Sequence, residues 1–200
     1  APSLLVVPAN SPFNTVDELV QAAKARPGML TMASQSSGSG GHLFAEMLRS
    51  QAGATFNHIP YRGSAPALMD MVSSRVDAFF DPLITSGPFV KEGKLKALAI
   101  GAAQRSPVFP QVSTLGELGY ERVSLVAWFG MAVKAGTPAP VVKRLSDEVI
   151  KALNNPELAK RFTDQGLDVS PQASPVFRTF MESEISRWGK VIKDAGIVLE

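Results

Sequence analysis

A run of serine and glycine residues at 34–42 offers the clearest chemistry in this sequence. It reads SQSSGSGGH, follows the apolar run Met29–Ala33 and precedes the amphipathic segment Leu43–Leu48. Glycine has no Cβ, so such a loop can bend closely around a ligand. If a helix begins after the loop, its first N–H groups lack partners within the helix and carry partial positive charge. The pattern therefore predicts a site for an anion such as a carboxylate or a phosphate.

The loop does not carry the signature of a nucleotide-binding or hydrolytic loop. It lacks the lysine of the phosphate-binding loop, and neither G-x-G-x-x-G nor G-x-S-x-G can be read through it. Serine and glycine are also preferred at helix starts. An ordinary polar loop with good capping residues is therefore the alternative interpretation.

Composition excludes several classes of function. The chain has 200 residues, 45% of them apolar, and a formal net charge of +2. A charge this small, with Lys and Arg scattered, argues against nucleic acid or an anionic membrane as a partner. There is no cysteine, and the only histidines are His42 and His58, so a disulfide or a zinc site is not expected. The residues indicate no cofactor, no catalytic triad and no membrane span.

Apolar runs alternate with helix signals over the first hundred residues. Helices are expected between the strands, the first opened by a capping box at Thr15–Glu18. Such alternation is typical of a mostly parallel sheet covered by helices, with ligands at the carboxyl ends of the strands. The expected strands are Ser3–Val7, Met29–Ala33, Thr55–Ile59, Val76–Phe80 and Leu95–Ile100.

Three loops should meet at one edge of this sheet. They are Ser34–Gly41, Tyr61–Ala65 and Asp81–Ser86, each following an expected strand. Their convergence favours a ligand site over a simple helix cap at the first loop.

The last third of the sequence is rich in helix signals and poor in strands. The apolar segment Val123–Val133 is longer than a typical strand and could cross between domains. Helices are expected to begin at Thr137-Pro138, Asn155-Pro156 and Ser174-Pro175, the last one closed by Gly196. A small strand is expected at Leu167–Val169.

Several dispersed segments together resemble the extracytoplasmic solute receptors of tripartite tricarboxylate transporters, often called Bug receptors. No one segment is diagnostic, but their order and spacing are specific. The segments are Thr15–Leu19, Lys24–Gly28, the serine/glycine loop with His42-Leu43, Ile59–Leu68, Gly93–Ala99, Ala127–Gly130, Ala135–Pro138 and Arg187–Ile192.

The resemblance implies an α/β fold like that of the class II periplasmic binding proteins, with a ligand clamped between two lobes. Residues 1–7 would be a crossing strand, and residues 8–122 a complete, doubly wound second lobe that binds the ligand. Residues 123–200 would be the returning crossing strand and the helix-rich return half of the first lobe. The sequence opens on Ala1-Pro2 without a start methionine. We therefore expect a processed or truncated chain that lacks the amino-terminal part of the first lobe and one carboxylate-binding loop.

The resemblance also assigns site residues. It places a ligand carboxylate at the serine/glycine loop, through Ser34, Gln35 and Ser39, with backbone donors from Gly63, Ser64 and Ala65. The family commonly has Ser-Ser-Gly where this chain has Ser34-Gln35-Ser36, so Gln35 adds an amide that can donate to a ligand oxygen. Ser36 belongs to the same candidate set.

Other single residues have two interpretations. Asp81 could reach the cleft or could cap the turn at Pro82. Arg62 could pair with a carboxylate or be solvated. His42 and His58 are most simply packed histidines, with His42 at most indirectly near a ligand. Trp128 and Phe129 fit a core more readily than a cleft lining.

The sequence thus predicts a periplasmic receptor that captures a small di- or tricarboxylate or related organic acid and delivers it to the membrane subunits of a transporter. The alternative is the effector-sensing domain of a LysR-type transcription regulator, which also has two α/β lobes. The amphipathic helices after Thr137 carry many apolar positions, so we also expect the chain to form a homo-oligomer.

Overall fold

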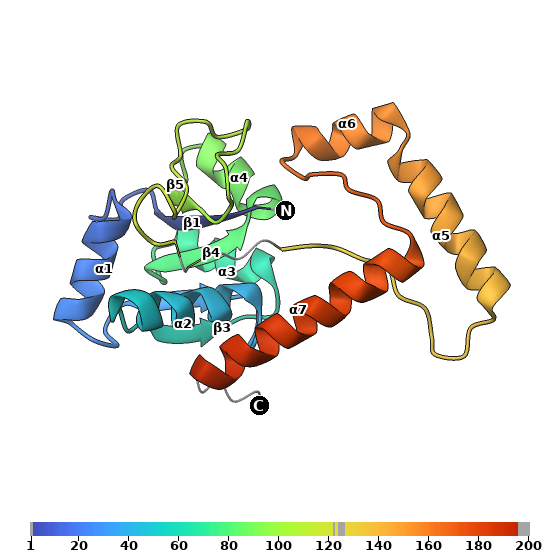
Figure 1. Ribbon diagram of the computed structural model, residues 1–200. Helices are drawn as coiled ribbons and strands as arrows, with labels where there is room; N and C mark the ends of the chain where they lie inside the picture. Colours follow the sequence, from blue (N-terminus) through green and yellow to red (C-terminus); the bar gives the residue numbers. More distant parts are fainter. Residues whose placement is uncertain (1, 122, 124–126, 196–200) are drawn as a thin grey trace.

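The computed structural model describes residues 2–121, 123 and 127–195 (Figure 1). A five-stranded sheet occupies the first half of the chain, in the order β3-β2-β4-β1-β5. The strands are β1 (Ser3–Pro8), β2 (Thr31–Ser34), β3 (Asn57–Pro60), β4 (Ala78–Pro82) and β5 (Leu95–Ile100).

The sheet is mixed, with one strand running against the others. β2 pairs in parallel with both β3 and β4, whereas β1 is antiparallel to both of its neighbours, β4 and β5. The four strands β2–β5 therefore point the same way, as the alternating pattern predicts, and β1 is the exception. The direction of β1 depends on which distant strands it pairs with, and its own apolar residues carry no information about that.

Helices follow the strands and extend through the second half of the chain. They are α1 (Val16–Ala25), α2 (Gly40–Ala52), α3 (Ser64–Val72), α4 (Leu83–Lys91), α5 (Ala139–Leu153), α6 (Pro156–Asp164) and α7 (Ser174–Ala195). The predicted capping box is present at α1: the Thr15 hydroxyl accepts from the Glu18 N–H, and the Glu18 carboxylate accepts from the Thr15 N–H. No described helix is both long and apolar enough to cross a membrane.

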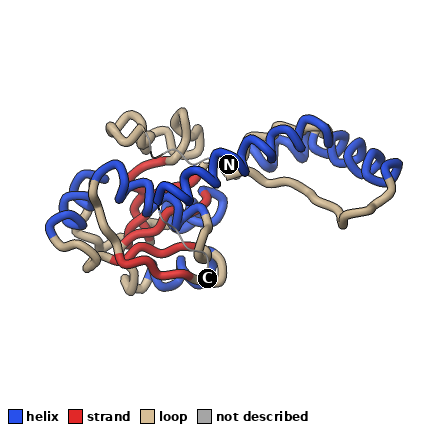
Figure 2. The backbone as a smooth tube through the Cα atoms, turned by 60° about the horizontal axis from the view of Figure 1, so that its bottom comes forward, coloured by secondary structure: helices blue, strands red, loops and turns tan. Residues whose placement is uncertain are grey.

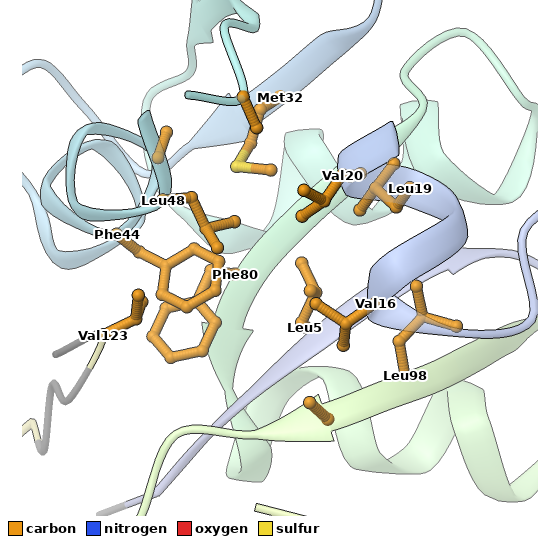
Figure 3. Close-up of a cluster of buried hydrophobic side chains, with 14 of the residues drawn as sticks. Leu5, Val16, Leu19, Val20, Met32, Phe44, Leu48, Phe80, Leu98 and Val123 are labelled. Atoms are coloured by element: carbon orange, nitrogen blue, oxygen red, sulfur yellow. The ribbon is translucent and has the colours of Figure 1, made fainter. Parts of the chain in front are cut away.

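Helices cover both faces of the sheet, which makes this lobe doubly wound. Side chains alternate along β1, so Leu5 and Val7 face one core while Leu4 and Val6 face the other. The first core, drawn in Figure 3, packs α1 and α2 on the sheet, and its Phe44 and Phe80 rings are stacked with centroids 3.7 Å apart. The second core packs α3 and α4 on the opposite face.

Residues 127–195, called the helical arm below, are organised differently. Neither α5 nor α6 contains a buried residue. In Figures 1 and 2 these two helices lie to one side of the sheet, while α7 runs back from them toward α2. There Trp188 and Ile192 of α7 pack against the first core. Gly166, just after α6, also lies against the Leu83 side chain of α4. The arm is thus joined to the lobe at two places, the second half of α7 and the end of α6.

Several predicted boundaries shift in the structure. β2 begins at Thr31, because Gly28 (φ +73°) and Met29 form a turn that leaves Met29 71% exposed. β3 begins two residues later than expected. β4 extends through Asp81 and Pro82, since both still pair with β1. Boundaries of this kind depend on the partner strand, which the local sequence does not contain.

Two strands predicted in the last third are wrong for the described residues. Of the expected crossing segment Val123–Val133, residues 127–133 form no strand and are largely exposed, while residues 124–126 lie outside the described residues. Leu167–Val169 is irregular and pairs with no described strand. The expected stop at Gly196 also lies outside the described residues.

Candidate functional site

Three loops meet at the carboxyl edge of β2, β3 and β4. The parallel pairing aligns the ends of these strands at Ser34, Pro60 and Asp81-Pro82. Each strand is followed within a few residues by a helix, α2, α3 or α4. The convergence predicted from the sequence is therefore present, and it brings three helix starts to one place.

Asp81 connects all three loops through its carboxylate. It accepts hydrogen bonds from Gln35 Nε2 of the β2 loop, from Ser64 Oγ at the start of α3 and from Thr85 Oγ1 in the first turn of α4. The residue has no exposed surface. Asp81 therefore holds the loops together from beneath, and it does not present its carboxylate at the surface in this structure.

Burial and hydrogen bonding shift the pKa of Asp81 in opposite directions. Burial raises the pKa of this carboxyl above its usual range, while the donors at Ser64, Thr85 and Gln35 pull it down. Because a buried charge must be paired or hydrogen-bonded, removal of these donors would leave a costly group in the core. The sequence alone does not identify Thr85 as a partner of Asp81. Its position four residues after Asp81, in a first helical turn, is the only local signal.

Gln35 bridges the end of β4 and the start of α2. Its amide nitrogen donates to Phe80 O at 3.2 Å and to Asp81 Oδ1 at 3.1 Å. Its amide oxygen accepts from Ser39 Oγ at 3.1 Å and from the Gly41 N–H at 3.2 Å. Both donors and both acceptor positions of this side chain are thus used within the protein, so its geometry is that of a support for the loop.

The serines of the loop differ in their exposure. Ser34 is fully buried, and its Oγ lies 2.6 Å from His58 Nε2 and donates to Ser36 O at 2.9 Å. Ser39 Oγ accepts from the Ser36 N–H, which closes a tight turn. Ser36 itself is exposed. The accessible part of the loop therefore comprises Ser36, which is exposed, and Ser37 and Ser39, which are partly exposed.

The helix starts at this edge lack the side-chain caps found elsewhere in the chain. No side chain of the N-cap residue caps α2, α3 or α4, and the same is true of α5 in the arm, whereas Thr15 caps α1 and Asn155 caps α6. At α2, Gln35 instead accepts from the Gly41 N–H. A helix start whose N-cap residue supplies no cap leaves N–H groups of its first turn to other acceptors. At α4 one such acceptor is Pro2 O, which takes the Leu83 N–H.

Glycine is required at two points of the site. Gly63 has φ +103°, and its N–H donates to Gln35 O at 2.8 Å, which ties the β3 loop to the β2 loop. A Cβ on Gly41 would lie 2.9 Å from Gln35 Oε1 and 3.1 Å from Phe80 O. The start of α2 can therefore approach β2 and β4 this closely only without a side chain at Gly41.

Two aromatic predictions need correction. Trp128 is 42% exposed and Phe129 71% exposed, so neither belongs to a core of the described residues. Trp128 instead packs edge-on against Phe177 and Phe180 of α7, and its indole N–H donates to Glu184. The prediction failed because an apolar segment is typical of a core only where a second layer covers it.

Arg62 is exposed and lies beside the site. Among the described residues, no three His, Asp or Glu side chains gather into a group that could hold a metal ion. What the site offers an incoming molecule is thus a set of peptide N–H groups and hydroxyls around helix starts, which suits an oxyanion.

The doubly wound lobe, the antiparallel entering strand β1 and a ligand edge of helix starts define an α/β fold of the periplasmic-binding-protein class. Solved structures of that class match closely. Rpa4515 of R. palustris with adipate superposes with a TM-score of 0.93 at 31% identity, covering 98% of this chain and 66% of that one. MatC from Rhodopseudomonas palustris with bound malate gives a TM-score of 0.89 at 31% identity, covering 96% and 66%. The periplasmic binding protein BugD gives 0.91 at 28% identity, covering 98% and 66%.

The chain belongs to the tripartite tricarboxylate transporter family of receptors, whose family profile matches residues 1–197. BugT of Bordetella pertussis is 32% identical over 199 residues, which cover 100% of this chain and 61% of BugT. The family resemblance and the fold class predicted from the sequence are confirmed, and the family is one of solute-binding receptors rather than enzymes. It favours the receptor over the LysR-type regulator. The chain spans about three fifths of the length of BugT.

Proposed function

We propose that this site captures a small di- or tricarboxylate, or a related organic acid, in the periplasm and that the receptor delivers it to the membrane subunits of a tripartite transporter. The observation that carries the proposal is the meeting of three helix starts around one buried hub, Asp81, none of them capped by the side chain of its own N-cap residue. The family assignment and the relatives solved with adipate and with malate support the same ligand class.

Each candidate residue has a place in this proposal. Ser36, Ser39 and the Gly63–Ser64–Ala65 turn surround the bound carboxylate. The backbone N–H groups of Ser64 and Ala65 are the main donors from the turn, because the Gly63 N–H already donates to Gln35 O. Ser34, Gln35 and Asp81 shape the loop that presents those donors. Peptide N–H groups at a helix start stabilise an anion without a cationic side chain. No full countercharge therefore needs to be desolvated with the ligand.

Calorimetric titration with adipate, malate, citrate and the neutral sugar glucose tests the ligand class. We expect heat from at least one carboxylate and none from glucose. Ser39→Ala should weaken that binding by up to about tenfold, because it removes the hydroxyl that accepts from the Ser36 N–H and donates to Gln35 Oε1, and so loosens the loop. Ser50→Ala, at the other end of α2, is the matched control and should leave the affinity unchanged. Binding of glucose alone would contradict the proposal.

A further inference from the structure

The two histidines of the chain lie against each other beneath the serine/glycine loop. His42 stands in the first turn of α2 and His58 in β3, and their rings are stacked with centroids 3.9 Å apart and planes 7° apart. They are 16 positions apart in sequence, so the contact exists only because α2 packs beside β3. This pair is not accounted for by core packing alone, because each ring also has a polar contact with the loop.

The two rings hold the two ends of one loop segment. The Gly38 N–H donates to His42 Nδ1 at 3.0 Å, and His58 Nε2 lies 2.6 Å from Ser34 Oγ. Gly38 has φ +73°, a left-handed conformation that the loop needs in order to turn toward α2. The position of residues 34–38 is therefore set by the imidazole pair on one side and by Gln35 and Asp81 on the other.

A proton on His42 Nδ1 is incompatible with this arrangement. A peptide N–H can only donate, so His42 Nδ1 must offer its lone pair to Gly38, and a neutral His42 carries its proton on Nε2. A second proton would have to go to Nδ1, where it would face the Gly38 N–H. Protonation of His42 and the bond to Gly38 thus exclude each other.

The surroundings of the two rings also disfavour a second proton on the pair. Burial and the neighbouring His42 lower the pKa of His58 to about 4, while Glu46, one turn along α2, opposes the shift. The Glu46 carboxylate is itself paired with Arg49 at 2.6 Å. The β2 loop offers the rings only uncharged serine and glycine residues, and α7 meets the adjoining core through Trp188 and Ile192. Two stacked imidazolium rings would repel each other, so the pair accepts one proton more readily than two.

We propose that the stacked His42–His58 pair positions the serine/glycine loop and makes carboxylate binding sensitive to pH. The neutral pair holds Ser34 and Gly38 in the binding geometry, and a proton on His42 releases Gly38. This inference rests on the proposed function for its effect on affinity, but the coupling between His42 and Gly38 is a property of the protein alone. Both residues act through the loop and are positioning residues.

The first test needs no ligand. Nuclear magnetic resonance of the wild-type chain follows the His42 ring and the Gly38 amide as the pH is lowered. We expect the Gly38 amide resonance to move with the same midpoint as the His42 ring. A Gly38 resonance that stays fixed while His42 takes up its proton would overturn the inference, whatever the chain binds.

The second test measures the affinity for malate or adipate at about pH 8 and about pH 6, a range in which histidine titrates and both diacids stay mainly doubly ionised. Wild-type affinity should fall by more than about twofold on acidification, because only the neutral pair holds Gly38 in the binding geometry. His42→Asn places an amide oxygen where Nδ1 accepts but cannot titrate in this range. Its affinity should change by less than about twofold between the two pH values.

The outcomes separate this inference from the proposed function. Equal pH profiles for wild type and His42→Asn would overturn the inference and leave the receptor function intact. A rise in affinity at low pH would also overturn it, because the added positive charge would then govern binding in place of the loop geometry. Failure of the wild type to bind any carboxylate at about pH 8 would count against the proposed function, and the resonance test would still decide the coupling.

Discussion

The lobe built on the five-stranded sheet and the helical arm differ in how far their apolar residues are buried. In the lobe, all six residues of β1 are buried, and both faces of the sheet are covered by helices. In the arm, Val141 and Leu145 of α5 and Ile185 of α7 are 43 to 70% exposed. An amphipathic helix is stabilised mainly by what its apolar face packs against. The lobe supplies that partner within its own residues, whereas α5 and α6 have none among the described residues that buries them.

Truncation of a stacked core ring should give the largest difference in the free energy of unfolding between a lobe variant and an arm variant. Phe80 is 1% exposed and stacks on Phe44. Phe80→Ala should lower the free energy of unfolding of the lobe by about 3–5 kcal/mol through lost burial and a cavity. Leu145→Ala in the arm should change it by about 0.5 kcal/mol or less. Urea unfolding monitored by circular dichroism measures both, and equal losses would mean that the arm contributes to the core as much as the sheet does.

Alanine in place of glycine should have opposite effects in the two regions. In the lobe, Gly41→Ala forces a Cβ against Gln35 Oε1 and Phe80 O, and should destabilise by about 1–3 kcal/mol. In the arm, Gly189→Ala meets nothing within 4 Å inside α7 and should stabilise that helix by about 0.5–1 kcal/mol. Thermal unfolding of the two variants gives the signs directly. A stabilising Gly41→Ala would refute the close approach of α2 to the sheet.

The smallest effect on stability, and the clearest on assembly, should come from the exposed face of the arm. We expect the chain to self-associate at micromolar concentration through apolar side chains such as Val141, Leu145 and Ile185. Leu145→Lys should weaken this association and change the free energy of unfolding by about 0.5 kcal/mol or less. Glu148→Gln adds the same charge on the same helix without removing apolar surface. If sedimentation shows equal association for both variants, net charge rather than the apolar face controls assembly.

Much of the lobe follows from local sequence. The apolar runs give its five strands to within a few residues, and Thr15 with Glu18 marks the first helix start because the capping box is a purely local device. The convergence of the three loops also follows, since it needs only the rule that ligands lie at the carboxyl ends of parallel strands.

The rest depends on pairings that no local pattern contains. Asp81 lies within β4 because it pairs with β1, more than 70 residues away in sequence, and its role as a hub emerges only when three loops fold over it. The stacking of His42 on His58 has the same origin. Conversely, the apolar segment containing Phe129 predicts a core that the described residues do not build.

The antiparallel placement of β1 has a mechanical consequence. β1 lies between β4 and β5, with Leu4 directly opposite both Asp81 and Ile100. The Leu83 N–H also donates to Pro2 O, and the Gly101 N–H to Ser3 O. A tensile load applied at Pro2 would therefore be shared in shear by two ladders of hydrogen bonds at once. Force entering through β1 would therefore pass directly to the Asp81 hub and to the start of α4.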